Sequence, residues 1–192
     1  MISRTHDLAA FTALSAAIVF VPIGPITLGT ALLALLANQL GGIAPDLDQP
    51  TSPVWRDLPA TRLFGKIFSR VTGGHRFISH SIVGAVLFGI AAHFILLFFQ
   101  PIMQSVQLDI VWWAFMVGLA SHLFMDMFTK EGVPLLLPIP INFGIPPIRR
   151  LRITTGKKME FLVVFPLLVI INIWLYAANY PQVVAFLHTI GR

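Results

Sequence analysis

Long hydrophobic runs make up most of this sequence, and its charged residues lie mainly between them. A run of about 20 apolar residues can cross the hydrocarbon core of a bilayer as a helix, because a helix satisfies its own backbone polar groups. Of the 192 residues, 56% are hydrophobic and only 11% are charged, whereas soluble domains carry about 25% charged residues. The excess apolar surface must therefore face lipid. We predict an all-α, polytopic membrane protein that forms a single domain over residues 1–192, with about five spans near residues 8–23, 26–44, 78–99, 110–128 and 161–178.

The first hydrophobic run allows two interpretations. It follows a short charged start, as the apolar segment of a signal peptide does. Further apolar runs follow, however, and residues 22–25 (Pro-Ile-Gly-Pro) are typical of a tight turn between two helices. We therefore expect the first run to be retained as a transmembrane helix.

The remaining composition narrows the chemistry. The chain contains no cysteine, which excludes disulfides and thiolate metal sites. Its net charge of +5 comes from basic residues that are dispersed among the hydrophobic runs. We interpret these residues as topology signals and lipid headgroup contacts, and we expect no nucleic-acid partner.

Alternating spans place the polar candidates on one side of the membrane. With five spans, the starts of the first, third and fifth and the ends of the second and fourth share one face. That face also receives all of the 13 Lys and Arg residues except Arg192. By the positive-inside rule it is cytoplasmic, as is the amino terminus. The candidate metal ligands on this face are His6, Asp46, Asp48, His75, His80, His122 and Asp126.

Two pairs among these candidates have informative spacing. His122 and Asp126 are four apart in a predicted helix, so they project from one face about one turn apart. They can bind one metal ion together, or they can be a hydrogen-bonded pair that stabilises helix packing. In an extended segment Asp46 and Asp48 point the same way, and they repel each other unless a cation lies between them. The alternative for this second pair is an ordinary loop in which Asp favours a turn between prolines.

A third group lies where a polar loop meets the third span. His75 and His80 flank this junction, and Arg76 lies beside the first of them. Imidazole is the commonest metal ligand, and guanidinium suits bidentate contact with phosphate, so the group favours a metal or anion site. Ser79 and Ser81 are expected to cap the following helix through their hydroxyls. The alternative is a pair of interfacial histidines with an arginine that reaches the lipid headgroups.

Together these residues offer too many donors for one tetrahedral ion. They suit two divalent ions about 3.5–4 Å apart, bridged by a carboxylate and water. Mixed His and Asp ligation without cysteine favours zinc or manganese. Glu160, at the start of the fifth span, is expected to support the site or to act as a helix N-terminal carboxylate. His93, in the middle of the third span, is expected to be a core or lumen residue.

Several short motifs follow one another in a characteristic order. They are Thr5-His6, Pro45-Asp46-Leu47-Asp48, His75-Arg76, Ser79-His80-Ser81, Ser121-His122 with Asp126, and Thr129 to Pro138. From residue 5 to about residue 140 the chain thereby resembles the YdjM-like inner-membrane proteins, which are described as metal-dependent hydrolases. That family usually has Gly and Thr where this chain has Phe77 and Ser79; Ser79 keeps the hydroxyl, whereas Phe77 puts a large ring where a bare backbone is usual. The resemblance implies a bacterial inner (plasma) membrane location, metal-dependent hydrolysis, and roles beside the ligands for Ser79, Ser121 and Thr129.

The functional hypothesis is a membrane-bound hydrolase that acts through metal-activated water on a phosphorylated or otherwise anionic membrane-associated substrate. Arg76 would steady the developing anion, and Asp48 or His80 would move the proton. Basic loops around a site at headgroup depth favour a membrane lipid or a lipid-linked phosphoester as substrate. One alternative is a divalent-metal transporter or sensor, which would need polar ligands near the middle of the membrane. Another is a membrane scaffold in which metal only ties helix ends together, because structural and catalytic sites share the same ligand types.

Overall fold

The structure is a computed structural model that describes residues 1–49, 78–139 and 141–190. Within these residues it is helical, with isolated β-bridges and no strand, as the all-α prediction requires. The α-helices are α1 (Ser3–Phe20), α2 (Leu28–Ile43), α5 (Ile82–Phe99), α6 (Leu108–Met127), α7 (Phe165–Ala178) and α8 (Tyr180–Thr189). Short 3₁₀ turns are η1 (Ala44–Asp48), η3 (Gln100–Ile102) and η4 (Arg149–Leu151), and the π-helical turn η5 (Glu160–Val164) leads directly into α7.

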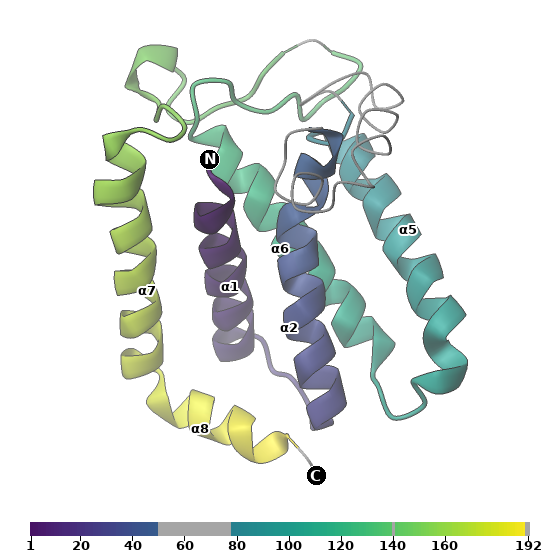
Figure 1. The fold of residues 1–192 in the computed structure, drawn as a ribbon. Coiled ribbons are helices and arrows are strands. Elements are labelled where there is room, and N and C mark those ends of the chain that lie inside the picture. The colour runs from purple at the N-terminus through teal and green to yellow at the C-terminus, as the bar shows by residue number, and fades with distance from the viewer. Residues whose placement is uncertain (50–77, 140, 191–192) are drawn as a thin grey trace, which may run out of the picture.

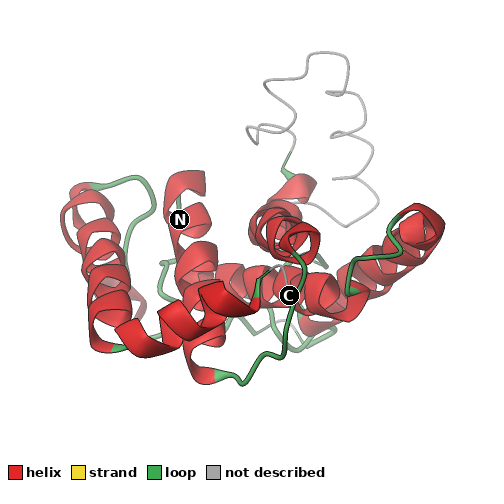
Figure 2. Cartoon of the chain, turned by 90° about the horizontal axis from the view of Figure 1, so that it is seen from below, coloured by secondary structure: helices red, strands yellow, loops and turns green. Residues whose placement is uncertain are grey.

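Helix α6 is the centre of the bundle (Figure 1). It packs along α2 and also contacts α1 and α5, while α7 packs against α1 at the edge. Seen from below, α7 and α5 lie at opposite sides of the bundle (Figure 2). Helix α8 is an addition to the predicted elements: it is too short to span a membrane, and it runs crosswise beneath α1, which it contacts.

One end of the bundle gathers helix termini that are far apart in the chain. The starts of α1, α5 and η5 and the ends of α2 and α6 all lie at the upper end in Figure 1. The described parts of the connection between α6 and η5 cross the same end. The side-by-side arrangement of these termini, which the alternation of spans predicts, is therefore present in the fold.

Four helices in the described ranges are long and apolar enough to cross a membrane. They cover Leu28–Asp48, Ile82–Ile102, Leu108–Met127 and Glu160–Ala178. Helix α1 falls outside this set because Arg4, His6 and Asp7 lie in its first turns, yet it packs among the other helices. Four spans are thus supported, and a fifth through α1 stays a prediction.

Two helices begin at residues that change where a candidate ligand lies relative to the predicted spans. Helix α1 begins at Ser3 rather than at residue 8, so His6 lies inside the first helix. Helix α5 begins at Ile82 rather than at residue 78, because Ser81 caps it by accepting the Gly84 amide hydrogen at 3.1 Å. Residues 78–81 consequently form a turn that precedes the helix, and His80 lies in this turn.

Glycines let α2 and α6 approach closely. A Cβ atom on Gly41 would overlap the backbone carbonyl of Phe115, and one on Gly118 would overlap that of Asn38. The buried amide of Asn38 adds a hydrogen bond of 3.1 Å to a backbone carbonyl of α6. Small residues and interhelical hydrogen bonds are the usual means by which membrane helices associate. The close approach brings the end of α2 alongside His122.

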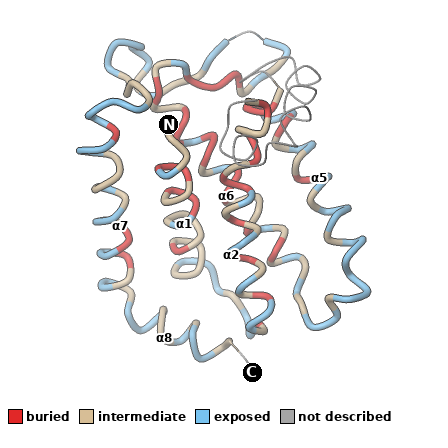
Figure 3. Tube along the Cα trace, in the orientation of Figure 1, coloured by how far each residue is buried: buried red, intermediate tan, exposed pale blue. Residues whose placement is uncertain are grey.

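Burial follows the pattern expected of a bundle in lipid. Buried positions concentrate along α1, α2 and α6, whereas α5 and α7 are largely exposed (Figure 3). The exposed side chains on these outer helices are apolar, such as Phe94 at 65% and Ile173 at 64% exposure. Lipid therefore suits their outer surfaces, and the polar groups of the protein are withdrawn into the bundle.

Candidate metal centre

Six of the predicted ligands come together at the end of the bundle where the termini meet. His6 comes from the second turn of α1 and the 78–81 turn supplies His80, while η1 and α6 contribute two residues each. Five of the six side chains are at most 2% exposed, and Asp46 is 18% exposed. The set is His6, Asp46, Asp48, His80, His122 and Asp126.

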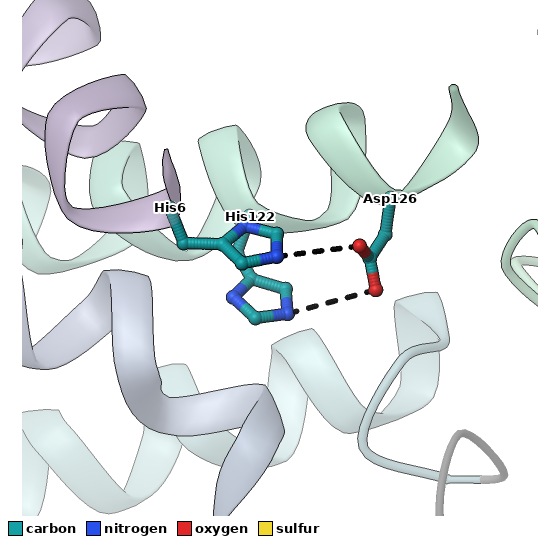
Figure 4. Close-up of side chains that lie close together, drawn as sticks. All are labelled: His6, His122 and Asp126. Carbon is teal, nitrogen blue, oxygen red and sulfur yellow. Dashed lines mark ion pairs between the residues drawn. The ribbon is translucent and has the colours of Figure 1, made fainter. Parts of the chain in front are cut away.

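One half of the site joins α1 to α6 (Figure 4). The rings of His6 and His122 are stacked, with centroids 3.8 Å apart and an interplanar angle of 10°. Asp126 faces both: its Oδ1 lies 3.3 Å from His6 Nε2, and its Oδ2 lies 3.9 Å from His122 Nε2. His122 and Asp126 thus share one helix face, as their spacing predicts. The α-amino group of Met1 also lies 2.6 Å from Asp126 Oδ1 and adds positive charge there.

The other half joins η1 to the 78–81 turn. His80 Nε2 lies 3.5 Å from Asp126 Oδ2 and 3.8 Å from Asp46 Oδ1. Asp46 Oδ1 also lies 3.7 Å from His122 Nε2. The donor atoms of Asp46, His80 and His122 lie within 4.8 Å of one another, as do those of His6, His122 and Asp126. Each of these two overlapping groups can hold a metal ion.

Hydrogen bonds direct the same nitrogen of two histidines into the site. His122 Nδ1 lies 2.6 Å from the Gly42 carbonyl, which can only accept, so Nδ1 carries the hydrogen. Ser79 Oγ donates its hydrogen to Asp48 and therefore accepts from His80 Nδ1 at 3.0 Å. When these rings are neutral, each Nε2 carries a lone pair that faces the centre of the site, where a cation can bind it. Metal-ligating histidines typically have their second ring nitrogen fixed in this way.

His6 provides a direct test of whether the residues fit a metal ion. Its ring is 2% exposed, and among the described residues neither ring nitrogen has a hydrogen-bond partner of acceptable geometry. A buried imidazole without such partners is costly, and a cation bound at its nitrogen would remove that cost. Together with the neighbouring carboxylates, this donor set fits a divalent metal ion.

His80 lies outside the spanning helices, and both its burial and nearby charges affect its pKa. Burial by itself would lower the pKa of His80, but hydrogen bonds and charge from Asp126 and Asp48 outweigh burial. The pKa of His80 is therefore raised above its usual value. A proton and a metal ion compete for this position.

The YdjM inner membrane protein family matches residues 1–186 of the chain. The chain belongs to this family. It is also 28% identical over 163 residues to the uncharacterized protein YvsG of Bacillus subtilis (strain 168). These aligned residues cover 85% of this chain and 87% of YvsG. No solved structure matches the chain. Family and apolar helices together identify an integral protein of the inner membrane.

In this YdjM-family chain, the three residues predicted to support the metal ligands differ in how close they lie to those ligands. Ser79 joins Asp48 to His80, as described above. Thr129 is buried and donates its Oγ1 hydrogen to the Asp126 carbonyl at 2.8 Å, so it fixes the end of α6. Ser121 donates to the Gly118 carbonyl of its own helix at 2.7 Å, so its hydroxyl is used within α6.

Glu160 supports the YdjM-family site through the backbone. It is completely buried, and its Oε1 accepts the Ile2 amide hydrogen at 2.8 Å. Its Oε2 accepts the Gly156 amide hydrogen at 2.7 Å. Glu160 thereby ties the start of α1, which carries His6, to the connection that precedes η5.

The prediction for Asp46 and Asp48 needs a correction. The two residues lie in the 3₁₀ turn η1, which has Pro45 as its second residue, and not in an extended segment. They consequently do not point the same way but approach opposite nitrogens of His80: Asp46 faces Nε2, and Asp48 Oδ2 lies 3.7 Å from Nδ1. The predicted ligand His75, with Arg76 and Phe77, lies outside the described residues.

Three contributors to the site were not predicted. The Gly42 carbonyl orients His122, and a backbone acceptor leaves no mark in the sequence. Asn38 fastens α2 to α6, and a lone amide inside an apolar run is the signal that could have identified it. Asp7 is half-buried beside His6, and its Oδ1 has no hydrogen-bond partner among the described residues. A charge in the first turns of a hydrophobic helix is the corresponding signal.

Proposed function

We propose that this YdjM-family protein is a membrane-bound, metal-dependent hydrolase with its site at the cytoplasmic end of the bundle. The observation that carries the proposal is the pair of overlapping donor groups, His6–His122–Asp126 and Asp46–His80–His122. Both consist of His and Asp side chains, and four helical elements or turns converge to form them: α1, η1, the 78–81 turn and α6.

Two ions, zinc or manganese, fit the donors better than one. Asp126 turns Oδ1 toward His6 and Oδ2 toward His80, so one carboxylate can serve both sides. His6 would hold the first ion, while His80 and Asp46 would hold the second. His122 Nε2 lies between the two groups and can bind only one ion. Paired ions of this kind, about 3.5–4 Å apart, are common in hydrolytic sites.

Bound divalent ions would supply a Lewis acid and a water of lowered pKa. The protein's own side chains would orient the ligands, move a proton and stabilise the developing anion. Asp48 and Ser79 would keep His80 in one orientation, and Asp48 or His80 would move a proton during hydrolysis. Asp46, the most exposed donor, marks the side from which water and substrate would enter. Arg76 would steady the anion that develops during the reaction.

The surroundings favour an anionic substrate that resides in the membrane. The site lies at the ends of the spans, where lipid headgroups are expected, and exposed basic side chains occupy the described connection at the same end. A phosphorylated lipid or a lipid-linked phosphoester fits this position and charge. The exposed basic residues are Arg149, Arg150, Lys157 and Lys158.

The test is hydrolysis by the purified protein loaded with zinc or manganese. Anionic phospholipids and polyprenyl phosphates are the first substrates to offer, with release of phosphate or headgroup as the readout. We expect turnover by the native chain and none by His122→Ala, with His93→Ala as the matched control. Metal-loaded protein that is inactive on every phosphoester, carboxylic ester and amide offered would contradict the proposal.

A metal-stabilised scaffold is the second candidate, and the near-complete burial of most donors favours it. A structural site has no open coordination position, whereas a catalytic site keeps one. Cobalt(II) substitution separates the two. If phosphate or another small anion changes the visible spectrum of the cobalt protein, a position is open; an unresponsive spectrum supports the scaffold. A transport role is less favoured because the donors lie at one end of the spans.

A further inference from the structure

Two adjoining cavities lie between α5 and α6, toward the end of the bundle opposite the metal centre. The first has a volume of about 440 Å³ and lies where α5 ends and α6 begins. The second has a volume of about 540 Å³ and lies further along the two helices. His93 lines both cavities, so they adjoin at this side chain, and together they are called the α5–α6 groove.

The two parts of this α5–α6 groove differ in chemistry. The first part includes four polar side chains, whereas the second is apolar apart from His93. At the polar end, Asp109 is the only carboxylate and neither Lys nor Arg lines the cavity among the residues that the structure describes. The polar side chains are His93, Gln100, Gln104 and Asp109; the apolar part is lined by Val86, Ile90, Phe94, Trp112 and Met116.

The two parts follow the order of a lipid molecule, with the polar part where a headgroup lies and the apolar part where an acyl chain lies. Gln100 lies directly after α5 and Asp109 is the second residue of α6, so both lie where the spans end. His93 is about two turns inside the end of α5, since each turn contains 3.6 residues. The polar part is therefore at headgroup depth in the leaflet opposite the metal centre, and the apolar part points toward the middle of the bilayer.

The walls of the groove are fixed by hydrogen bonds. Trp112 Nε1 donates to the Gly89 carbonyl at 2.8 Å, which holds α5 against α6 beside the apolar part. The connection between the two helices is tied to the start of α2, because the Gln107 amide donates to Thr30 Oγ1 at 3.0 Å. Thr27 Oγ1 donates to the Ser105 carbonyl nearby at 2.9 Å. These hydrogen bonds hold together the helices and the connection that line the groove.

We propose that the α5–α6 groove binds one phospholipid with an ethanolamine headgroup from the leaflet opposite the metal centre. An acyl chain lies in the apolar part. Asp109 pairs with the headgroup ammonium, while His93 and Gln100 supply hydrogens for the phosphate oxygens. A lone carboxylate without a lining cation pairs with a headgroup ammonium in preference to a headgroup that is only anionic, and the primary ammonium of ethanolamine, unlike the quaternary one of choline, can also donate hydrogen bonds to it. This inference is independent of the hydrolase proposal, because it uses no residue of the metal centre.

Two neighbouring tryptophans provide the experiment. Trp112 lines the groove, whereas Trp113 is 63% exposed on the outer surface of the same helix. We would compare a variant that keeps only Trp112 with one that keeps only Trp113, the other three of the four tryptophans being replaced by Phe. Both are reconstituted in phosphatidylcholine vesicles with increasing fractions of brominated-chain phosphatidylethanolamine or phosphatidylglycerol, and bromine quenching of fluorescence is recorded.

The expected result is selective quenching of Trp112. Brominated phosphatidylethanolamine should quench it at about fivefold lower fraction than phosphatidylglycerol, the scale of one charge contact at a membrane surface. Trp113 should respond equally to both lipids. Asp109→Asn should abolish the selectivity of Trp112, and Val86→Phe should reduce its quenching by either lipid.

Several results would overturn the proposal. They are equal quenching of Trp112 by the two lipids, a preference for phosphatidylglycerol, or selectivity that survives Asp109→Asn. Protection of Trp112 from both lipids that disappears when the protein is diluted in the bilayer would assign the groove to a second copy of the chain. If the tryptophan variants fail to fold, native mass spectrometry of the unmodified protein decides instead, because it should retain ethanolamine phospholipid selectively and Asp109→Asn should not.

Discussion

The Nε2 atoms of His80 and His122 lie 3.3 Å apart at the centre of the candidate metal site. The Nδ1 atoms of the two rings are held by Ser79 and by the Gly42 carbonyl respectively. Two neutral rings so fixed would present lone pairs to each other, which is unfavourable unless a proton or a metal ion shares the space. The close contact of α2 with α6 sets one ring, and the 78–81 turn sets the other. The helix packing thus creates a position that attracts a cation.

Removing a ligand from this position should remove metal. We expect about two divalent ions per chain in the native protein, the number that suits the proposed dinuclear site. His122→Ala should lose most of them, because His122 belongs to both donor groups. His93→Ala should retain them, because His93 lines the distant groove. Elemental analysis after gentle purification gives the count, and a native chain without metal even after reconstitution would contradict the site.

Metal occupancy should fall as the pH is lowered. A protonated imidazole cannot bind metal, and the pKa of His80 is raised above its usual value of about 6.5. We therefore expect the loss of metal at limiting concentration to begin above pH ~6.5. Equilibrium dialysis over a series of pH values measures this directly; an occupancy that stays constant down to pH ~5 would exclude proton competition at His80.

The metal-free protein should show the opposite dependence in its stability. A raised pKa in the folded state means that protonated His80 stabilises the fold, fully below the unfolded pKa of about 6.5. This contribution is lost as the pH rises through the higher folded pKa. Thermal unfolding with a chelator present should therefore move to lower temperature as the pH rises above ~6.5 and His80 loses its proton. With metal bound, unfolding should move to higher temperature over the same range.

Packing of α2 against α6 should tolerate no added side chain. Gly41→Ala would place a methyl group on the backbone carbonyl of Phe115, which cannot move without the helix. We expect a loss of at least roughly 1–3 kcal/mol in the free energy of unfolding, together with weaker metal binding because the Gly42 carbonyl shifts from His122. Gly24→Ala is the matched control, since a Cβ atom there meets nothing within 4 Å. Equal stability of the two variants would show that the close approach is not maintained.

Part of the arrangement of the candidate ligands could be predicted from the sequence. Alternation of hydrophobic runs predicts that His6, His80 and Asp126 share one end of the bundle, because a chain that crosses a membrane repeatedly has little topological freedom. The four-residue spacing of His122 and Asp126 likewise predicts their common face. These inferences depend on periodicity, which a hydropathy pattern records.

Other features depend on contacts that the pattern does not record. The 3₁₀ turn at Asp46 and Asp48 arises from the local geometry that begins at Pro45, whereas spacing alone suggests an extended pair. The Gly42 carbonyl reaches His122 only because glycines bring α2 and α6 together. Asp48 approaches His80 Nδ1 because the 78–81 turn, which ends where Ser81 caps α5, directs the His80 ring toward it.

The orientation of the bundle in the membrane is predicted to place the metal centre in the cytoplasm. Reporter fusions after Lys158, just before η5, and after Gln104, between α5 and α6, should give opposite signals, because these two connections lie at opposite ends of the bundle (Figure 1). A phosphatase reporter, active only outside the cytoplasm, should be active after Gln104 and inactive after Lys158. The reverse pattern would invert the topology, and identical signals would contradict the shared end of the candidate ligands.

Asp48 offers the sharpest distinction between a residue that binds metal and one that orients a ligand. Its Oδ2 accepts from Ser79 and lies 3.7 Å from His80 Nδ1, on the side of the ring that faces away from the other donors. Asp48→Asn keeps the size of the side chain but removes its charge. We expect metal affinity to fall by about 10–100-fold, the usual effect of losing a partner that orients a metal-binding histidine.

Asp126→Asn is the matched comparison, because Asp126 faces His6, His80 and His122 directly. Its loss should abolish binding at one position or both, so that added metal does not restore the native count. Titration of each chelated variant with zinc, followed by elemental analysis at saturation, separates the outcomes. If Asp48→Asn also fails to reach the native count at saturation, Asp48 is a ligand itself, and the orientation of His80 must come from Ser79 alone.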